Sequence, residues 1–336
     1  MTTDAPLLAV QDLGVDFPTD DGTLHAVDGV TFQVRDHEVL GMVGESGSGK
    51  TVTALAMLGL LPKRAHVRGS VRLRGEELLG RPERELERLR GETVAIVFQD
   101  ALAAFNPVLP VGAQVGEAIA VHHPDVGASH RRARVVELLE LVGIPDAARR
   151  ADAYPHQYSG GMRQRAMLAM ALANDPALLI ADEPTTALDV TVQAQILRLL
   201  AGLQAELGLA MLLITHDLGI VARVASRVSV MYAGEIVESA PAAELFRRPM
   251  HPYTHGLLSC VPVPGRIRED EQLGSIPGMV PTIVRGFRGC AFRSRCQHAA
   301  PECEGAIPRH GASSRHTYLC RLQPVAAASS SGEAGA

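Results

Sequence analysis

The stretch that decides the fold is Gly44-Glu45-Ser46-Gly47-Ser48-Gly49-Lys50-Thr51, which matches G-x-x-x-x-G-K-[ST] at every specified position. Glycines let backbone N–H groups curve around an anion, because they adopt conformations that a Cβ atom disfavours. In this motif Lys50 reaches the β- and γ-phosphates, and the hydroxyl of Thr51 holds Mg²⁺. The stretch therefore predicts a site for a nucleoside triphosphate and magnesium.

The flanking residues supply the context that this motif requires. Residues 38–43 predict a short buried strand, and residues 51–58 predict a helix whose N-terminus faces the phosphates. The alternative is a chance turn rich in glycine and serine. The order of strand, loop and helix disfavours that alternative.

Composition limits the classes of protein to consider. With 336 residues, the chain is expected to form one large domain with an appendage, or two domains. A net charge of −5, 4% aromatic residues and no Trp argue against a nucleic-acid surface. No apolar run reaches the length of a membrane span, and residues 1–6 lack signal-peptide features. We expect a soluble, cytosolic protein that reaches a membrane only through a partner.

The first forty residues predict an antiparallel edge ahead of the phosphate loop. Alternating apolar and polar residues indicate strands at Leu7–Phe17, Leu24–Val27 and Val30–Val34. Phe17 is placed to stack on an adenine ring. Packing in the core is the alternative, and the sequence alone favours it.

Polar residues follow three apolar strands further along the chain. Gln99 follows the strand 94–98, Asp182 and Glu183 end the strand 177–182, and His216 follows the strand 210–215. Ligands of open α/β sheets collect at such strand ends. Asp182 suits Mg²⁺ and Glu183 suits activation of a water molecule. The alternatives are a solvated glutamine, acids that cap a turn and a structural histidine, but the phosphate loop upstream favours the catalytic interpretation.

A second anion-binding terminus is predicted between these strands. Ser159, Gly160 and Gly161 precede the helix 163–173, where N–H groups point outwards. A helix cap alone would also explain them. Asp189 likewise comes before a predicted helix, 192–207. Residues 101–150 predict further helices, which are interrupted at Pro and Gly residues.

Taken together, these motifs resemble the nucleotide-binding subunit of an ATP-binding cassette (ABC) transporter over residues 7–245. The resemblance implies an α/β P-loop NTPase core of the ABC type with an antiparallel β edge, a helical subdomain and a small Cys-containing C-terminal extension. The implied bounds are residues 1–100 and 163–245 for the core, 101–162 for the helical subdomain with the signature motif, 246–323 for the extension and 324–336 for a disordered tail.

The same resemblance implies a role for each motif. Phe17 corresponds to the A-loop, Gln99 to the Q-loop, Asp182 and Glu183 to Walker B, Asp189 to the D-loop and His216 to the switch histidine. ATP would be bound by Phe17, Gly44, Ser46, Gly47, Ser48, Gly49, Lys50, Thr51, Gln99, Asp182, Ser159, Gly160, Gly161 and Asp189. Mg²⁺ would be bound by Thr51, Gln99 and Asp182, and hydrolysis to ADP and phosphate would be catalysed by Glu183, His216, Gln99 and Lys50. The signature departs from the commoner pattern at Tyr158 and Met162.

Shorter stretches resemble the dipeptide/oligopeptide importer branch, which includes nickel importers. They are 98–100, 106–109, 154–157, 163–165, 251–254, 276–278 and 289–292, with departures at Ala101 and Phe105. This branch implies a second ABC ATPase subunit in a heterodimer, two transmembrane permease subunits, an extracytoplasmic solute-binding protein and a peripheral location on the cytoplasmic side of the membrane. The alternatives are an importer of nickel or another small solute, a soluble ABC ATPase without transport, and an inactive regulatory cassette, against which Glu183 and His216 argue.

Four cysteines cluster near the C-terminus with the spacing C-x5-C-x6-C-x16-C, at Cys290, Cys296, Cys303 and Cys320. Zinc sites usually contain closer pairs, whereas a [4Fe–4S] cluster needs four thiolates. Similar importer ATPases carry such a cluster, so we expect a [4Fe–4S] cluster here, with zinc and free or disulfide thiols as alternatives. The Pro- and Gly-rich extension has little apolar periodicity, and a metal centre would stabilise it.

Overall fold

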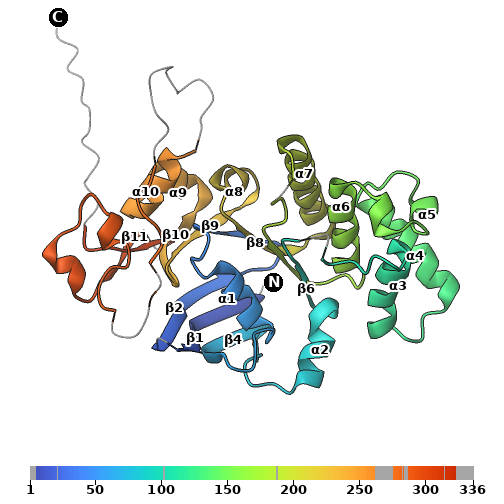
Figure 1. Ribbon diagram of the computed structural model, residues 1–336, viewed down its shortest axis with the longest axis horizontal. Helices are drawn as coiled ribbons and strands as arrows, with labels where there is room; N and C mark the ends of the chain where they lie inside the picture. The colour runs from blue at the N-terminus through green and yellow to red at the C-terminus, as the bar shows by residue number, and fades with distance from the viewer. Residues whose placement is uncertain are drawn as a thin grey trace, which may run out of the picture.

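The computed structural model describes residues 5–20, 22–100, 103–186, 188–261, 275–281, 283, 287–313 and 315–322. The predicted disordered tail, 324–336, lies outside these residues. A large sheet runs through the molecule, with a smaller antiparallel sheet on one side and helices on the other (Figure 1). The helices α3 to α6 gather at one end of the large sheet, and the C-terminal segments gather at the opposite end (Figure 1).

The smaller sheet confirms the predicted antiparallel edge. Its strands have the order β2-β1-β4-β5 and are β1 (Leu8–Thr19), β2 (Gly22–Val34), β4 (His66–Leu73) and β5 (Glu76–Glu77). The sequence predicted two strands, at 24–27 and 30–34, but the structure has the single strand β2 there. The register to β1 shifts between Val27 and Val30, where Gly29 has a φ of 62°, so the irregularity is a bulge within one strand.

The large sheet has a parallel centre and an antiparallel edge. Its order is β11-β12-β10-β9-β3-β8-β7-β6. The parallel strands are β9 (Arg227–Tyr232), β3 (Val39–Val43), β8 (Ala210–Thr215), β7 (Leu178–Asp182) and β6 (Val94–Val97). Nearly all of their residues are buried, as the continuous apolar runs predict for a sheet covered on both faces.

The helices cover this sheet and complete three apolar cores. Helix α1 (Lys50–Met57) contacts β1, β2 and β7 and so lies between the two sheets. The others are α2 (Glu83–Glu92), α3 (Val111–His122), α4 (Ala128–Leu141), α5 (Ala147–Arg150), α6 (Gly160–Ala171), α7 (Val190–Leu207), α8 (Leu218–Val224), α9 (Ala242–Arg247) and α10 (Pro252–Ser259). None of the helices that the structure describes is both long and apolar enough to cross a bilayer.

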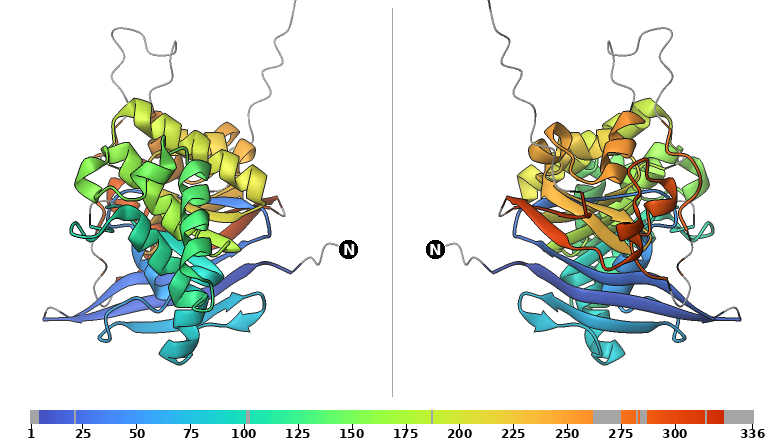
Figure 2. Two further views of the ribbon diagram at one scale, coloured as in Figure 1. Left: turned by 90° about the vertical axis from the view of Figure 1, so that its right-hand side faces the viewer. Right: turned by 90° about the vertical axis from the view of Figure 1, so that its left-hand side faces the viewer.

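The C-terminal extension continues the large sheet. Its hairpin, β11 (Arg309–Ser313) and β12 (His316–Leu319), pairs with the antiparallel strand β10 (Glu235–Pro241), and the right-hand view of Figure 2 shows the hairpin beside that strand. The rings of Tyr232, Tyr253 and Phe292 pack with centroids 4.6–5.3 Å apart. Buried apolar packing and sheet pairing therefore hold the extension in place.

Candidate active site

The phosphate-binding loop lies between β3 and α1, as predicted. At Gly44 an added Cβ would fall 2.1 Å from the carbonyl oxygen of Met231 in β9, and at Gly49 it would fall 2.7 Å from that of Ala26 in β2. Gly49 also has a φ of 101°, which side chains rarely adopt. Glycine is required at both positions because the loop backbone runs directly against two strands.

Lys50 lies inside this loop. Its Nζ donates hydrogen bonds to the carbonyl oxygens of Gly44 at 2.8 Å and Glu45 at 2.9 Å, and to Ser48 Oγ at 3.3 Å. Burial lowers the pKa of Lys50, while the nearby carboxylates of Glu183 and Asp182 act in the opposite direction. The arrangement places one ammonium group at the centre of an anion-binding loop.

Asp182 ends β7 beside this lysine. Its side chain is buried and hydrogen-bonded to that of Thr51, yet its Oδ1 has no hydrogen-bond partner. Burial raises the pKa of Asp182, and the neighbouring Glu183 raises it further. An unpartnered carboxylate oxygen next to a hydroxyl group is a donor set that fits Mg²⁺.

Glu183 is surrounded by polar groups from neighbouring strands. Its carboxylate accepts a hydrogen bond from Thr186 Oγ1 at 2.7 Å, lies 3.2 Å from His216 Nδ1 and accepts one from Gln99 Nε2 at 3.4 Å. Burial would raise the pKa of Glu183, but the hydrogen bonds from Thr186 and His216 outweigh it and lower that pKa. Glu183 also has a φ of 48°, a strained backbone conformation of the kind found at functional sites. The result is an ionised carboxylate that can orient a water molecule.

A cavity of about 1,070 Å³ brings these groups together. Its lining includes the following predicted site residues: Phe17, Ser46, Gly47, Ser48, Gly49, Lys50, Thr51, Gln99, Glu183 and His216. Gly44 and Asp182 are hydrogen-bonded to Lys50 and Thr51 of this lining, whereas the signature residues and Asp189 are not among the lining residues. Ser159 Oγ accepts a hydrogen bond from Met162 N–H at 3.3 Å and so caps α6, while Asp189 caps α7 through Val192 N–H at 2.9 Å. The predicted site residues therefore form two groups in the structure, one at this cavity and one at the starts of α6 and α7.

Sequence reasoning missed one wall of this cavity. Leu257 and residues 278–281 of the extension also line it. Their only signal in the sequence was the resemblance of 276–278 to one importer branch, which carries no chemistry. These residues lie more than 200 positions from the phosphate loop, and pattern analysis of short windows does not detect such pairings.

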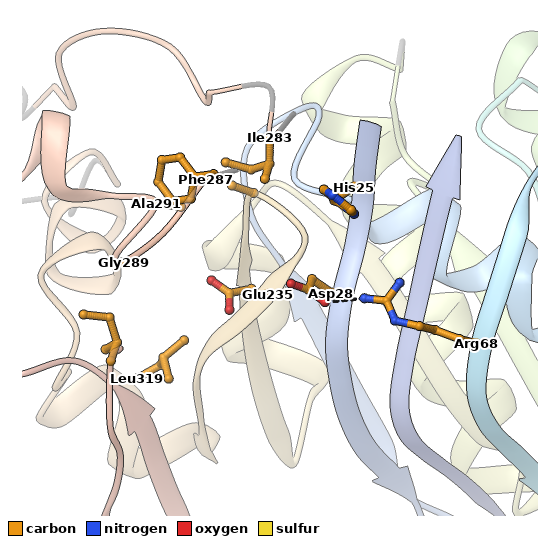
Figure 3. A pocket seen from close by; sticks show the side chains of 11 residues that line it. His25, Asp28, Arg68, Glu235, Ile283, Phe287, Gly289, Ala291 and Leu319 are labelled. Atoms are coloured by element: carbon orange, nitrogen blue, oxygen red, sulfur yellow. Dashed lines mark hydrogen bonds and ion pairs between the residues drawn. The ribbon is translucent and has the colours of Figure 1, made fainter. Parts of the chain in front are cut away.

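A second cavity, of about 340 Å³, lies between β2, β10 and the extension (Figure 3). Asp28 and Glu235 face each other across it, with Phe287 and Leu319 on the extension side. Burial raises the pKa of Glu235 to about 7, and the charge of Asp28 acts in the same direction. This carboxyl group therefore changes protonation near neutral pH.

The cysteine prediction is wrong. Among the described residues, which include Cys290, Cys296, Cys303 and Cys320, no group of three or more His, Cys, Asp or Glu side chains is arranged to hold a metal ion, and all four thiols are free. Burial raises the pKa of Cys290 to about 11, and it also raises the pKa values of Cys296 and Cys320. Metal clusters bind thiolates, whereas burial favours the neutral thiol form of Cys290, Cys296 and Cys320. The structure supports neither the [4Fe–4S] cluster nor the zinc alternative.

A phosphate-binding loop, an unpartnered aspartate and a polar cage around a glutamate, at the ends of adjacent parallel strands, define a P-loop nucleoside triphosphatase. Residues 27–186 match the family model described as ABC transporter, and residues 237–303 match that of the oligopeptide/dipeptide transporter C-terminal region. The chain belongs to the ABC family of ATPases, in the branch of oligopeptide and dipeptide transporters.

The similar proteins agree with this assignment. A putative peptide import ATP-binding protein of Brucella abortus (strain 2308) is 51% identical, over 89% of this chain and 90% of that protein. The oligopeptide transport ATP-binding protein OppD of Mycobacterium tuberculosis (strain ATCC 25618 / H37Rv) is 52% identical, over 90% of this chain and 50% of OppD. Among solved structures, a dimeric ATP-binding cassette bound to ADP and Pi has a TM-score of 0.63 at 26% identity, covering 70% of this chain and 98% of that chain. The predicted fold class and family are confirmed.

Proposed function

We propose that this ATPase energises the uptake of dipeptides or oligopeptides through partner membrane subunits, fed by an extracytoplasmic solute-binding protein. The observation that carries the proposal is the polar cage around Glu183 in a chain whose C-terminal region matches peptide transporters. The names of the similar proteins point to the same substrate class. In this proposal the chain is peripheral, on the cytoplasmic side of the membrane.

The nucleotide is assigned to the cavity beside the phosphate loop. Phe17 stacks on the adenine ring, and the N–H groups of residues 44–51 and Lys50 Nζ bind the phosphates. Thr51, Asp182 and Gln99 would hold Mg²⁺, and the unpartnered Oδ1 of Asp182 supports this assignment. When bound, Mg²⁺ neutralises charge on the β- and γ-phosphates.

Hydrolysis depends on Glu183 as general base. Its carboxylate is ionised, so it can orient a water molecule and accept a proton from it. Gln99 and His216 hold this carboxylate from neighbouring strands, and His216 also contacts the γ-phosphate. Lys50 offsets negative charge that develops on the phosphate oxygens, so catalysis consists of positioning and charge stabilisation.

The signature residues are assigned to a partner's nucleotide. Ser159 and Gly160 are exposed and do not line this chain's own cavity, so they are free to complete the site of a second ABC ATPase subunit, which we propose is a different chain. Asp189 is likewise exposed and absent from the lining of this cavity, so we assign it to the partner's site as well. Residues 1–100 with 163–245 then form the ATPase core, 101–162 the helical subdomain that carries the signature, and 246–323 the extension.

The Glu183→Gln variant tests the catalytic assignment. In the complex with its co-purified partners, ATP should still bind, while turnover falls by about 10²–10⁴-fold, as expected for loss of a general base. Phosphate release and peptide uptake into vesicles measure the two parts of the proposal. Unchanged turnover would remove Glu183 from the mechanism, and ATP-driven uptake of nickel without peptides would replace the proposed substrate.

A further inference from the structure

One buried arginine connects the C-terminal extension to the phosphate-binding loop. The side chain of Arg295 is 4% exposed, and its Nη1 and Nη2 donate to the two carboxylate oxygens of Glu45 at 2.9 and 3.0 Å. Two parallel N–H···O bonds between ionised groups make a strong and directional contact. Glu45 is the second residue of the phosphate loop, so the extension reaches directly into the nucleotide site.

Two further hydrogen bonds of Arg295 hold a second part of the same site, and Nη1 also donates to the hydroxyl of Tyr232 at 3.4 Å. Nε donates to the carbonyl oxygen of Pro277 at 2.7 Å, and Nη2 also donates to that of Ile276 at 3.1 Å. These residues lead directly into the segment 278–281, which lines the nucleotide cavity. The guanidinium group therefore fixes the phosphate loop and the extension's wall of the cavity at once.

The backbone of Glu45 is fixed from the same side. Its N–H donates to the hydroxyl of Tyr253 at 2.9 Å, and Tyr253 is packed in the aromatic cluster of the extension. The carbonyl oxygen of Glu45 accepts from Lys50 Nζ at 2.9 Å. Every polar part of Glu45 is thus held, by groups of the extension and by the phosphate-binding lysine.

The charge of Glu45 makes this contact matter for nucleotide binding. A carboxylate in a phosphate-binding loop repels a triphosphate unless a cation neutralises it. The charge of Glu45 is felt at Lys50, where it acts to raise the pKa. Arg295 supplies the neutralising cation, 2.9 Å from the carboxylate and shielded from solvent.

We propose that Arg295 is a positioning residue of the nucleotide site, which neutralises Glu45 beside the phosphates and anchors residues 276–281, so that the C-terminal extension sets the affinity for ATP. This inference rests on the nucleotide site of the proposed function. It assigns to the extension a role in the ATPase cycle that needs no metal.

The test measures ATP affinity of the full chain by titration. Arg295→Gln keeps donors for the carbonyl groups but removes the charge, and it should raise the Kd for ATP by about tenfold. Adding Glu45→Gln should recover most of this loss, because the repelling carboxylate is gone. Arg295→Lys keeps the charge and should lose less than Arg295→Gln. High salt should shrink the defect of Arg295→Gln, and in turnover assays KM should rise more than kcat falls.

Arg293→Gln is the matched control, and Glu45 supplies a second test. Arg293 lies in the same turn but stacks on Phe287 and donates to the carbonyl oxygen of Arg288, so its loss should leave ATP affinity unchanged.

Glu45→Asp keeps the charge and shortens its reach to Arg295, so it should bind ATP more weakly than Glu45→Gln. This comparison holds even if Arg295→Gln does not fold.

Five outcomes decide the inference. Weaker binding by Arg295→Gln with recovery in the double variant supports it, and so does weaker binding by Glu45→Asp than by Glu45→Gln. Wild-type affinity in Arg295→Gln, or a double variant no better than the single one, overturns the inference alone. A wild-type chain that does not bind ATP overturns the proposed function together with it.

Discussion

Two adjacent carboxylates at the end of β7 have opposite environments. Asp182 is buried with an unpartnered oxygen, and burial raises its pKa. Glu183 receives hydrogen bonds from Thr186 and His216, and its pKa is lowered. Pairs of acids with pKa values shifted apart are typical of sites where one acid binds a cation and the other acts on a proton.

This contrast predicts the effect of Asp182→Asn. Burial raises the pKa of Asp182, so its ionised form is disfavoured in the nucleotide-free fold, and its neutralisation should increase the free energy of unfolding at neutral pH. The increase in ATP affinity that Mg²⁺ normally gives should disappear. Urea unfolding in a chelator and ATP titration with and without Mg²⁺ measure the two effects.

Glu183→Gln is the control for that prediction. Because hydrogen bonds lower the pKa of Glu183, its ionised form is favoured in the fold, so removing this charge should not stabilise the chain. An Asp182→Asn variant that retains the full Mg²⁺ dependence would show that the unpartnered Oδ1 does not bind the ion.

At the scale of single residues, the sequence predicted which side chains gather at the phosphate loop, but not the side chains of the extension that contact this loop. Lys50, Asp182 and Glu183 were predictable because short-range patterns specify a loop or a strand end. The contact from Arg295 to Glu45 was not, because it spans 250 positions and an isolated arginine has no pattern. The cysteine spacing was misleading, since spacing alone states neither burial nor protonation.

At the scale of elements, the parallel strands were predictable, whereas the β-hairpin inside the predicted extension was not. Buried strands such as 178–182 are continuous apolar runs, whose period and length identify them. The hairpin β11–β12 has short and mostly polar strands, which pair with β10 and are further held by the buried contact of His316 with Glu238. Its position along the edge of the large sheet creates the second cavity, where Asp28 and Glu235 are close (Figure 3).

This cavity predicts a pH dependence of stability. The pKa of Glu235 is raised from 4.5 to about 7, so the folded chain binds an extra proton between those values. Stability from this group is therefore present below pH 4.5 and is lost as the pH rises through about 7. Glu235→Gln should leave stability unchanged at pH 4 and increase the free energy of unfolding by about 3 kcal/mol at pH 8.

Urea unfolding of both proteins across this pH range checks the prediction. Glu87→Gln, at an exposed position on α2, is the control for a loss of charge without burial. If the wild type and Glu235→Gln have parallel stability curves from pH 4 to 8, the carboxyl group of Glu235 is ionised in the fold, contrary to the prediction.

At the scale of the whole molecule, we propose that the chain contributes to two different nucleotide sites, its own and that of a second subunit. The nucleotide cavity contains the phosphate loop and Glu183, whereas Ser159 and Gly160 are exposed at the start of α6 and do not line it. A helix N-terminus with free N–H groups binds anions, so an exposed one is suited to a phosphate group of another subunit.

Ser159→Arg tests this division of the molecule. A long cation at the exposed cap of α6 should not change the fold, because the Ser159 side chain is exposed and its hydrogen bond is to Met162 N–H in the first turn of the same helix. In the isolated chain, ATP affinity should stay close to that of the wild type, since the nucleotide cavity is untouched. In the assembled complex, hydrolysis at the site that this signature completes should fall by about 10²-fold, the effect of removing a preorganised donor.

The control is His156→Arg, which adds the same charge at an exposed position just before the signature. It should leave both measurements near the wild type, because it blocks no helix N-terminus. Nucleotide titration of the isolated chain and single-turnover hydrolysis in the complex separate the two effects. A large loss of ATP affinity in the isolated Ser159→Arg chain would mean that the signature serves its own phosphate loop, and the proposed exchange of sites between two subunits would then be wrong.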